Sequence, residues 1–272
     1  MATYHSKERS LKPTISGIDP SHSGFVRINQ HGLYWERYGD PHAPCVALLH
    51  HGLGSIRSWR RQIPDFIDAG WQVLAHDRWG YGRSDERPEF KLAYLADDAQ
   101  EAFALLNTLG IEQLNLVGHS DGGSIALLMA SEQPERINAM VVVAAHIYFE
   151  PMMVDGLNMI AQSVTDPVLM EGLAREHGER TPRLLQAWVD HWRAADSQSL
   201  SMGELLPTIV CPTMVVQGEL DEHATPQHAV DIAEGVQQGS LWLIPEVKHM
   251  PPHEIPEAFN QRVLQFLADS TA

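Results

Sequence analysis

The stretch Leu116-Val117-Gly118-His119-Ser120-Asp121-Gly122-Gly123 decides how the rest of the chain is interpreted. A serine stands between two glycines directly after an apolar run, which neither a buried strand nor an ordinary helix start requires. The pattern Gly118-x-Ser120-x-Gly122 is typical of a sharp strand-to-helix turn, in which glycines relieve crowding and the serine hydroxyl is exposed. A glycine-rich turn whose serine only caps a helix is the alternative. The first interpretation predicts a nucleophilic serine at position 120.

Short apolar runs alternate with longer helical patterns on both sides of this turn. Continuous apolar runs such as residues 140–144 are typical of strands buried on both faces of a parallel sheet. The alternation predicts βαβ units and an α/β fold with a mostly parallel eight-stranded sheet, helices on both faces and an antiparallel hairpin at one edge. The predicted strands are 24–29, 33–38, 46–50, 72–76, 114–117, 139–144, 213–217 and 241–244. The predicted helices are 59–69, 93–109, 124–130, 226–234 and 255–267.

The alternation stops at residues 147–204, where no strand pattern appears. Leu184, Leu185, Trp188 and Trp192 follow helical spacing, and the stretch is too long for a simple loop. We therefore expect a small helical cap inserted into the α/β core. Trp188 and Trp192 either pack this cap onto the core or line a substrate pocket.

The 272 residues fit one α/β domain with an insertion. The expected core comprises residues 23–146 and 205–272, and the polar residues 1–22 are expected to form a flexible N-terminal arm. That arm has no apolar run of the kind that a secretory signal needs. No apolar stretch approaches 18 residues, so we expect no membrane span and a cytoplasmic protein.

The charge and the cysteines exclude several classes of function. There are 35 acidic and 19 basic residues, a formal net charge of −16, which disfavours nucleic acid as a partner. The chain's two cysteines, Cys45 and Cys211, each precede an apolar run and predict small buried residues rather than a disulfide framework or a metal site. We expect neither a metal nor a cofactor.

Three reactive side chains follow predicted strands, at the edge where open α/β sheets bind ligands. They are Ser120, Asp221 and His249. A serine hydroxyl needs a base, histidine titrates near neutrality, and a buried carboxylate orients the imidazole. This set, in this chain order, predicts a catalytic triad. His253 is the weaker candidate for the base, and Glu219 and Glu222 are weaker candidates for the orienting acid.

An acyl-transfer site also needs donors for the oxyanion of the transition state. The backbone N–H of Asp121, at the start of a helix, and that of Leu53, after the His51-Gly52 pair, are the predicted donors. His50 and His146 lie at strand ends. His50 is either a buried strand-end histidine or, like His146, a pocket residue.

These motifs carry a family resemblance. Residues 77–84 (DRWGYGRS) resemble a D-x-R-G-x-G-x-S segment, and residues 249–256 resemble a catalytic histidine loop, both common in the α/β-hydrolase superfamily. The chain resembles that superfamily over nearly its whole length. Residues 118–123, 205–212 and 217–221 are similar to the biphenyl hydrolase-like, or valacyclovir hydrolase, subfamily. That subfamily hydrolyses esters of α-amino acids. Its strand-to-helix turn around the serine, called the elbow below, carries Trp where this chain has His119.

Asp121 raises a question, because its carboxylate would lie a few ångströms from the developing oxyanion. Two like charges 4–6 Å apart repel by about 3–4 kcal/mol at an effective dielectric constant near 20. The subfamily resemblance implies that Asp121 could hold the ammonium group of a substrate. The alternative is a side chain turned aside and stabilised at the helix N-terminus.

The sequence therefore predicts a cofactor-free serine hydrolase that cleaves small carboxylic esters through an acyl-enzyme, with α-amino acid esters as favoured substrates. The expected partners are a small-molecule ester and water. Hydrolysis of a carbon–carbon bond in a β-diketone, or of a lactone or amide, is an alternative on the same triad. A non-hydrolytic ligand receptor is the alternative from another class. Haloalkane dehalogenase and epoxide hydrolase activities are disfavoured, because Ser120 occupies the position at which those families carry an aspartate.

Overall fold

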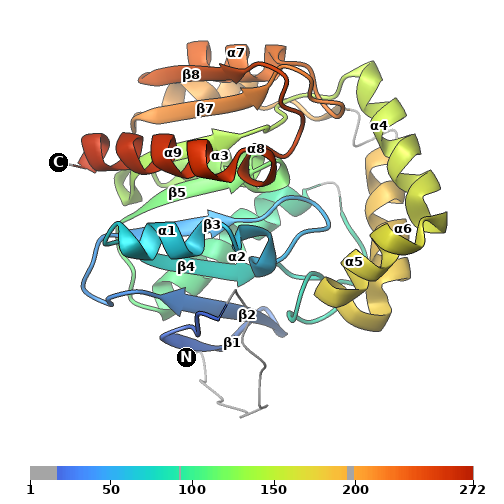
Figure 1. The fold of residues 1–272 in the computed structure, drawn as a ribbon, viewed down its shortest axis with the longest axis horizontal. Helices are drawn as coiled ribbons and strands as arrows, with labels where there is room; N and C mark the ends of the chain where they lie inside the picture. The colour runs from blue at the N-terminus through green and yellow to red at the C-terminus, as the bar shows by residue number, and fades with distance from the viewer. Residues whose placement is uncertain (1–16, 92, 195–198, 272) are drawn as a thin grey trace.

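The computed structural model describes residues 17–91, 93–194 and 199–271. Most of the expected N-terminal arm, residues 1–16, lies outside the described residues. Eight strands form one sheet in the order β1-β2-β4-β3-β5-β6-β7-β8 (Figure 1). The strands are β1 His22–Ile28, β2 His31–Tyr38, β3 Cys45–Leu49, β4 Gln72–Asp77, β5 Leu114–His119, β6 Ile137–Val143, β7 Thr213–Gly218 and β8 Gly239–Ile244.

The sheet is parallel except at one edge. β1 pairs with β2 and β2 with β4 in antiparallel fashion, and every other neighbouring pair is parallel. All residues of β4, β5 and β7 are buried. The apolar side chains on both faces of these strands are shielded from solvent, because helices lie on both sides of the sheet. The predicted α/β class, the mostly parallel eight-stranded sheet and the edge hairpin are confirmed.

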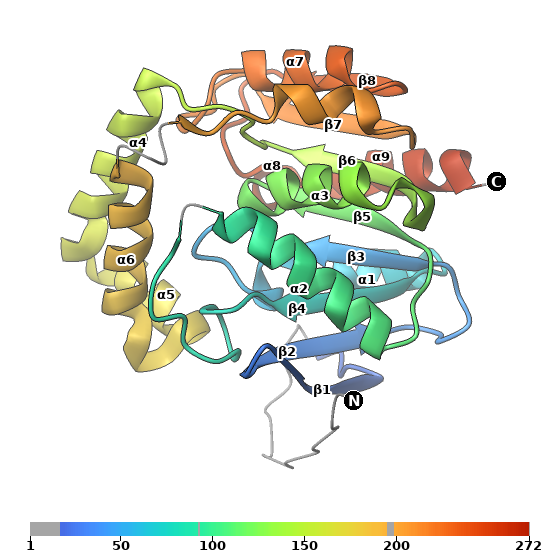
Figure 2. The same cartoon turned by 180° about the vertical axis from the view of Figure 1, so that it is seen from behind.

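Helices cover both faces of the sheet. α1 and α9 lie on the face toward the viewer in Figure 1, and α2, α3 and α7 lie on the other face, seen in Figure 2. Phe259 and Val263 of α9 and Phe66 of α1 are fully buried against the sheet. The helices of the core are α1 Ile63–Asp68, α2 Tyr94–Thr108, α3 Asp121–Glu132, α7 Gln227–Gly235, α8 Pro251–Glu254 and α9 Pro256–Thr271, with short 3-10 turns η1 Ile56–Trp59 and η2 Pro134–Arg136.

Residues 147–204, called the helical insertion below, connect β6 to β7 and contain no named strand in their described part. The insertion stands beside the carboxyl ends of the parallel strands (Figure 1). Its apolar stripe on α6, which includes Trp188 and Trp192, is buried. Its elements are α4 Pro151–Gln162, η3 Ser163–Thr165, α5 Pro167–His177, η4 Gly178–Arg180, α6 Thr181–Arg193 and η6 Gly203–Thr208. In the described ranges, no helix combines the length and the hydropathy that crossing a bilayer requires.

Candidate active site

Ser120 occupies a strained turn between β5 and α3. Its φ of +54° and ψ of −119° lie outside the regions that L-residues favour. A Cβ on Gly118 would lie 2.1 Å from the carbonyl oxygen of Gly122, and one on Gly122 would lie 2.1 Å from that of Leu49. Both glycines are therefore required by close backbone contacts, and the turn presents the Ser120 hydroxyl at the carboxyl end of the sheet.

The loops after β7 and β8 bring an aspartate and a histidine to this hydroxyl. His249 Nε2 lies 3.1 Å from Ser120 Oγ, and His249 Nδ1 lies 2.8 Å from Asp221 Oδ2. With a proton on Nδ1 donated to Asp221, Nε2 is free to accept the proton of the serine hydroxyl. The other carboxylate oxygen of Asp221 accepts the N–H groups of His223 and Ala224, at 2.8 and 3.2 Å. The three side chains thus form an unbroken hydroxyl–imidazole–carboxylate chain.

The electrostatics of this chain suit a general base. Burial opposes the charged form of His249, but the Asp221 carboxylate and its hydrogen bond outweigh that effect and raise the pKa of the imidazole. Burial opposes ionisation of Asp221 as well, yet His249 and the backbone N–H groups lower the pKa of that carboxyl. Asp221 is therefore an anion that can stabilise an imidazolium.

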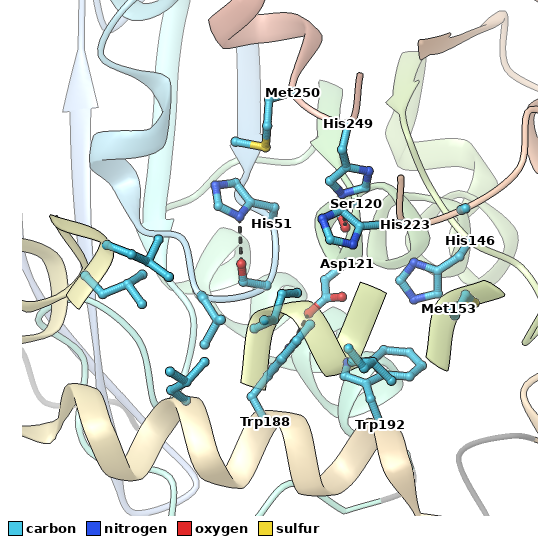
Figure 3. Close-up of a pocket in the computed structure, with 18 residues that line it drawn as sticks. His51, Ser120, Asp121, His146, Met153, Trp188, Trp192, His223, His249 and Met250 are labelled. Atoms are coloured by element: carbon cyan, nitrogen blue, oxygen red, sulfur yellow. Dashed lines mark hydrogen bonds between the residues drawn. The ribbon is translucent and has the colours of Figure 1, made fainter. Parts of the chain in front are cut away.

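A turn at residues 51–54 faces the nucleophile. Gly54 N–H donates to His51 O at 3.1 Å, and Leu53 has a φ of +60°. His51 Nδ1 donates to the carbonyl oxygen of Gly52 at 2.6 Å, the bond drawn in Figure 3. In the described part of the chain, the N–H groups of Leu53 and Asp121 donate to no protein acceptor. Both residues line the cavity at Ser120, as the two predicted oxyanion donors should.

Asp121 belongs to a buried charge cluster that also contains Arg78, Arg87 and Asp98. Its Oδ2 atom accepts from Tyr94 Oη at 2.8 Å and lies 3.3 Å from Arg78 Nη2. Asp98 pairs with Arg78 Nη1 at 2.7 Å and with Arg87 Nη2 at 2.6 Å. The positive charges of two guanidinium groups therefore balance the negative charges of two carboxylates. Burial opposes ionisation of Asp121, but Arg78 and the hydrogen bonds lower the pKa of this carboxyl.

A cavity of about 240 Å³ extends from Ser120 under the helical insertion. Trp188 and Trp192 of α6 lie along its floor in Figure 3, and His146 lies beside Asp121 at the end of β6. Burial lowers the pKa of His146 to about 4, so its imidazole is neutral. Most of the wall is apolar, contributed by Leu53, Met153, Leu157, Ile160, Leu169, Leu173, Leu185, Trp188, Trp192, Ala224 and Met250.

His50 is placed differently from its candidate role in substrate binding, and that hypothesis is corrected here. Its side chain is fully buried and does not line the cavity. Its Nδ1 atom donates to His51 O at 2.8 Å, and its Nε2 atom accepts from Arg78 N–H at 3.1 Å. Because both ring nitrogens are hydrogen-bonded to backbone groups, His50 connects the end of its strand to residue 78 and cannot bind a ligand.

The remaining histidines near the site have structural positions. His119 is 2% exposed and donates from Nε2 to His249 O at 2.8 Å, which places it behind the turn. His253 Nε2 donates to Ser58 O at 2.7 Å and does not contact Ser120. His223, which sequence reasoning missed, lines the cavity with its ring 4.7 Å from that of His249. Its only sequence signal was its position two residues after Asp221.

Arg78 is a further residue that sequence reasoning missed. It falls at the variable position after Asp77 in the family segment, where Trp79 and not Arg78 occupies the motif's arginine position, whereas its side chain crosses to Asp121, 43 positions later. In the described residues, no group of three or more His, Cys, Asp or Glu side chains could hold a metal ion. Cys45 and Cys211 are both free thiols.

A serine on a strained strand-to-helix turn, together with a histidine and an aspartate at neighbouring strand ends, matches the pattern of an α/β-hydrolase site. Residues 46–181 match the family model for the alpha/beta hydrolase fold, and the chain belongs to this family. It is 31% identical to human "Serine hydrolase BPHL" over 267 residues, which cover 90% of this chain and 86% of the relative. It thus resembles the biphenyl hydrolase-like subfamily, as its motifs predicted.

Other relatives carry a different chemistry in their names. The chain is 26% identical to "2-hydroxy-6-oxo-6-phenylhexa-2,4-dienoate hydrolase" of Comamonas testosteroni, over 90% of this chain and 96% of that one. The crystal structure of the enol-lactonase from Burkholderia xenovorans superposes with a TM-score of 0.73 at 20% identity, over 90% of this chain and 99% of that one. The latter similarity establishes the fold alone. The protein is thus a hydrolase of this family.

Proposed function

We propose that this protein is a serine hydrolase that cleaves small, uncharged carboxylic esters through an acyl-enzyme. The observation that carries the proposal is the hydrogen-bonded chain from Ser120 Oγ through His249 to Asp221, at 3.1 and 2.8 Å. Ser120 and His249 both border an apolar cavity large enough for a small ester. A hydroxyl–imidazole–carboxylate chain of these lengths activates a serine for attack on a carbonyl carbon.

The proposed reaction has two halves. Ser120 Oγ forms a bond to the ester carbonyl carbon while His249 Nε2 takes the hydroxyl proton, and the N–H groups of Leu53 and Asp121 hold the oxyanion. The alkoxide leaves as an alcohol with the proton from His249. Water then attacks the acyl-enzyme, its proton passes to His249, and the acid departs as the Ser120 hydroxyl is restored.

The charges around the cavity favour an ester over a substrate with a carboxylate. In the described part of the chain, no lysine or arginine lines the cavity, whereas the carboxylate of Asp121 does. A dienoate of the kind named for the Comamonas relative carries an anionic carboxylate, which this apolar wall would desolvate without offering a cationic partner. An uncharged ester pays no such penalty in an apolar pocket.

The proposal gives Asp121 an internal partner rather than a substrate ammonium group. Arg78 and Arg87 balance Asp98 and Asp121 within the chain, so an added ammonium would leave the buried cluster with a net positive charge. The Arg78 guanidinium also offsets the repulsion between the Asp121 carboxylate and the oxyanion. α-Amino acid esters are therefore expected to react, without preference over matched esters that lack the amine.

The helical insertion is proposed to act as the cap of this site. Trp188, Trp192 and Leu157 of the insertion line the cavity together with core residues Ser120 and His146. An apolar lid over the reacting atoms excludes water and selects acyl groups by shape.

Turnover of p-nitrophenyl butyrate, combined with labelling of Ser120 by a fluorophosphonate, tests the proposal. Wild-type protein should label once per chain and turn over many times, and Ser120→Ala should do neither. Labelling without turnover would identify a receptor. Hydrolysis of 2-hydroxy-6-oxo-6-phenylhexa-2,4-dienoate at a kcat/KM above that of every neutral ester would replace the ester proposal with carbon–carbon bond hydrolysis.

A further inference from the structure

The helical insertion contacts residues 52–57, which include the turn with the Leu53 N–H, at three points. The ring of Trp188 lies so close to Gly52 that a Cβ there would be 2.8 Å from it. Glu176 Oε2 accepts from Ser55 Oγ, and Glu176 Oε1 lies 3.3 Å from Arg57 Nε. The third contact, from His177 at the end of α5, is made to Leu53 itself.

His177 bridges two loops of the core. Its Nε2 atom donates to the carbonyl oxygen of Leu53 at 2.8 Å, and its Nδ1 atom accepts from Gly82 N–H at 2.9 Å. The N–H of Gly82 can only donate, so Nδ1 carries no proton and Nε2 carries one. The side chain is 4% exposed, and burial lowers the pKa of the imidazole to about 4, in keeping with this neutral form.

The bond to Leu53 acts on a strained residue. Leu53 has a φ of +60°, a conformation that non-glycine residues rarely adopt without being held there. The orientations of the two flanking peptide groups set its backbone angles. His51 holds the preceding peptide through the Gly52 carbonyl, and His177 holds the following peptide through the Leu53 carbonyl. If either group is released, Leu53 can relax and its N–H changes direction.

We infer that His177 is a positioning residue of the oxyanion hole, through which the docked helical insertion holds the Leu53 N–H toward Ser120. The inference rests on the proposed function, because an oxyanion forms only if Ser120 attacks a carbonyl. His177 does not line the cavity and touches no reacting atom. Its effect passes through the Leu53 peptide, so formation of the hole is coupled to docking of the insertion.

Two amide substitutions separate the Leu53 bond from the rest of the contact. His177→Gln can place an amide N–H near the former Nε2 and a carbonyl oxygen near the former Nδ1, so both bonds survive. His177→Asn is shorter and can accept from Gly82 N–H but cannot reach the Leu53 carbonyl. Glu176→Gln is the matched control, because Glu176 joins the insertion to Ser55 and Arg57 without touching Leu53.

The readouts are kcat and KM for p-nitrophenyl butyrate and the inhibition constant of a trifluoromethyl ketone, whose adduct with Ser120 carries an oxyanion. We expect His177→Asn to lose about 10- to 100-fold in kcat and a similar factor in ketone affinity, with KM within about threefold. His177→Gln should stay within about fivefold of wild type, and Glu176→Gln within about twofold. Thermal unfolding checks that each variant is folded.

An Asn variant that keeps wild-type kcat and ketone affinity overturns the inference, as does one that loses activity only through KM. Hydrogen exchange of the backbone amides provides a second test that does not depend on activity. Amides of residues 53–55 should exchange faster in His177→Asn than in Glu176→Gln, and equal rates overturn the inference. Wild-type protein that fails to react with both the ester and the fluorophosphonate contradicts the proposed function, while the exchange result still decides the role of His177.

Discussion

The Nη2 atom of Arg78 lies 3.3 Å from the Oδ2 atom of Asp121, and both side chains are 1% exposed. This contact explains how the Asp121 carboxylate can lie next to Ser120, the proposed nucleophile. The guanidinium compensates the charge of Asp121, and Tyr94 and Trp188 donate to the same carboxylate oxygen at 2.8 and 3.4 Å. The site therefore needs no cationic substrate to become neutral.

The first prediction concerns the substrate amine. The ethyl ester of phenylalanine and ethyl 3-phenylpropanoate differ in the ammonium group, so the ratio of their kcat/KM values reports any ammonium site. Scaled to their rates of hydroxide-catalysed hydrolysis, the two esters should agree within about threefold, or 0.7 kcal/mol. Asp121→Asn should change both values by the same factor. A tenfold preference for the amine that Asp121→Asn abolishes would establish Asp121 as an ammonium anchor.

The second prediction concerns the stability of the buried cluster. Arg78→Met leaves Asp98 with one guanidinium and Asp121 with none, and breaking a buried pair costs about 3–5 kcal/mol of the free energy of unfolding. Arg175→Met is the matched control, because Arg175 pairs with Glu171 at the surface, where both side chains are at least 70% exposed. Its cost should stay below about 0.5 kcal/mol. Urea unfolding followed by tryptophan fluorescence measures both, and equal costs would contradict the prediction.

The same cluster predicts a rescue of activity. In Arg78→Met the uncompensated Asp121 carboxylate opposes the oxyanion, so kcat should fall. Adding Asp121→Asn removes that charge while its backbone N–H stays in place, so the double variant should recover most of the kcat that the single variant lost. A double-mutant cycle with p-nitrophenyl butyrate measures the coupling. Additive losses would mean that Arg78 acts through the fold and not through the charge of Asp121.

The sequence predicted the sheet because its strands are marked by local composition. All eight strands lie within two residues of their expected limits, since β-branched and apolar runs bounded by turn residues need no tertiary information. The helix expected at 59–69 is instead the 3-10 turn Ile56–Trp59 followed by α1 from Ile63. Pro64 lacks an N–H and its ring would clash with the carbonyl of residue 60, so one helix cannot run through both.

The same locality explains what the sequence did not reveal about the site. The elbow at Ser120 is a local pattern, and its glycines could be interpreted from spacing alone. The partners of Leu53 and Asp121 are not local: His177 lies 124 positions from Leu53, and Arg78 lies 43 positions from Asp121. His50 illustrates the converse, because its position at a strand end suggested a ligand contact that its two backbone hydrogen bonds preclude.

The steric role of the elbow glycines gives a further prediction. A Cβ on Gly122 would lie 2.1 Å from Leu49 O, so Gly122→Ala must displace α3 from β3. We expect a loss of at least about 1–3 kcal/mol in the free energy of unfolding, together with a loss of fluorophosphonate labelling. Gly172→Ala in α5 is the control, because no atom lies within 4 Å of its Cβ and alanine favours a helix by up to about 1 kcal/mol. Equal free energies of unfolding for the two variants would contradict the conclusion that the turn has no room for a Cβ at position 122.

The last prediction is the pH dependence of kcat/KM. His249 must be neutral at Nε2 to accept the serine proton, so activity is lost as pH falls through its pKa. Asp221 raises that pKa above the ordinary value near 6.5. Asp221→Asn should therefore move the acid limb to lower pH and reduce kcat by about 10⁴-fold, because the imidazole loses its orientation and the imidazolium its counter-charge. Glu219→Gln, an exposed carboxylate two residues away, should leave both the limb and kcat unchanged. An acid limb that moves in Glu219→Gln but not in Asp221→Asn would transfer the orienting role to Glu219.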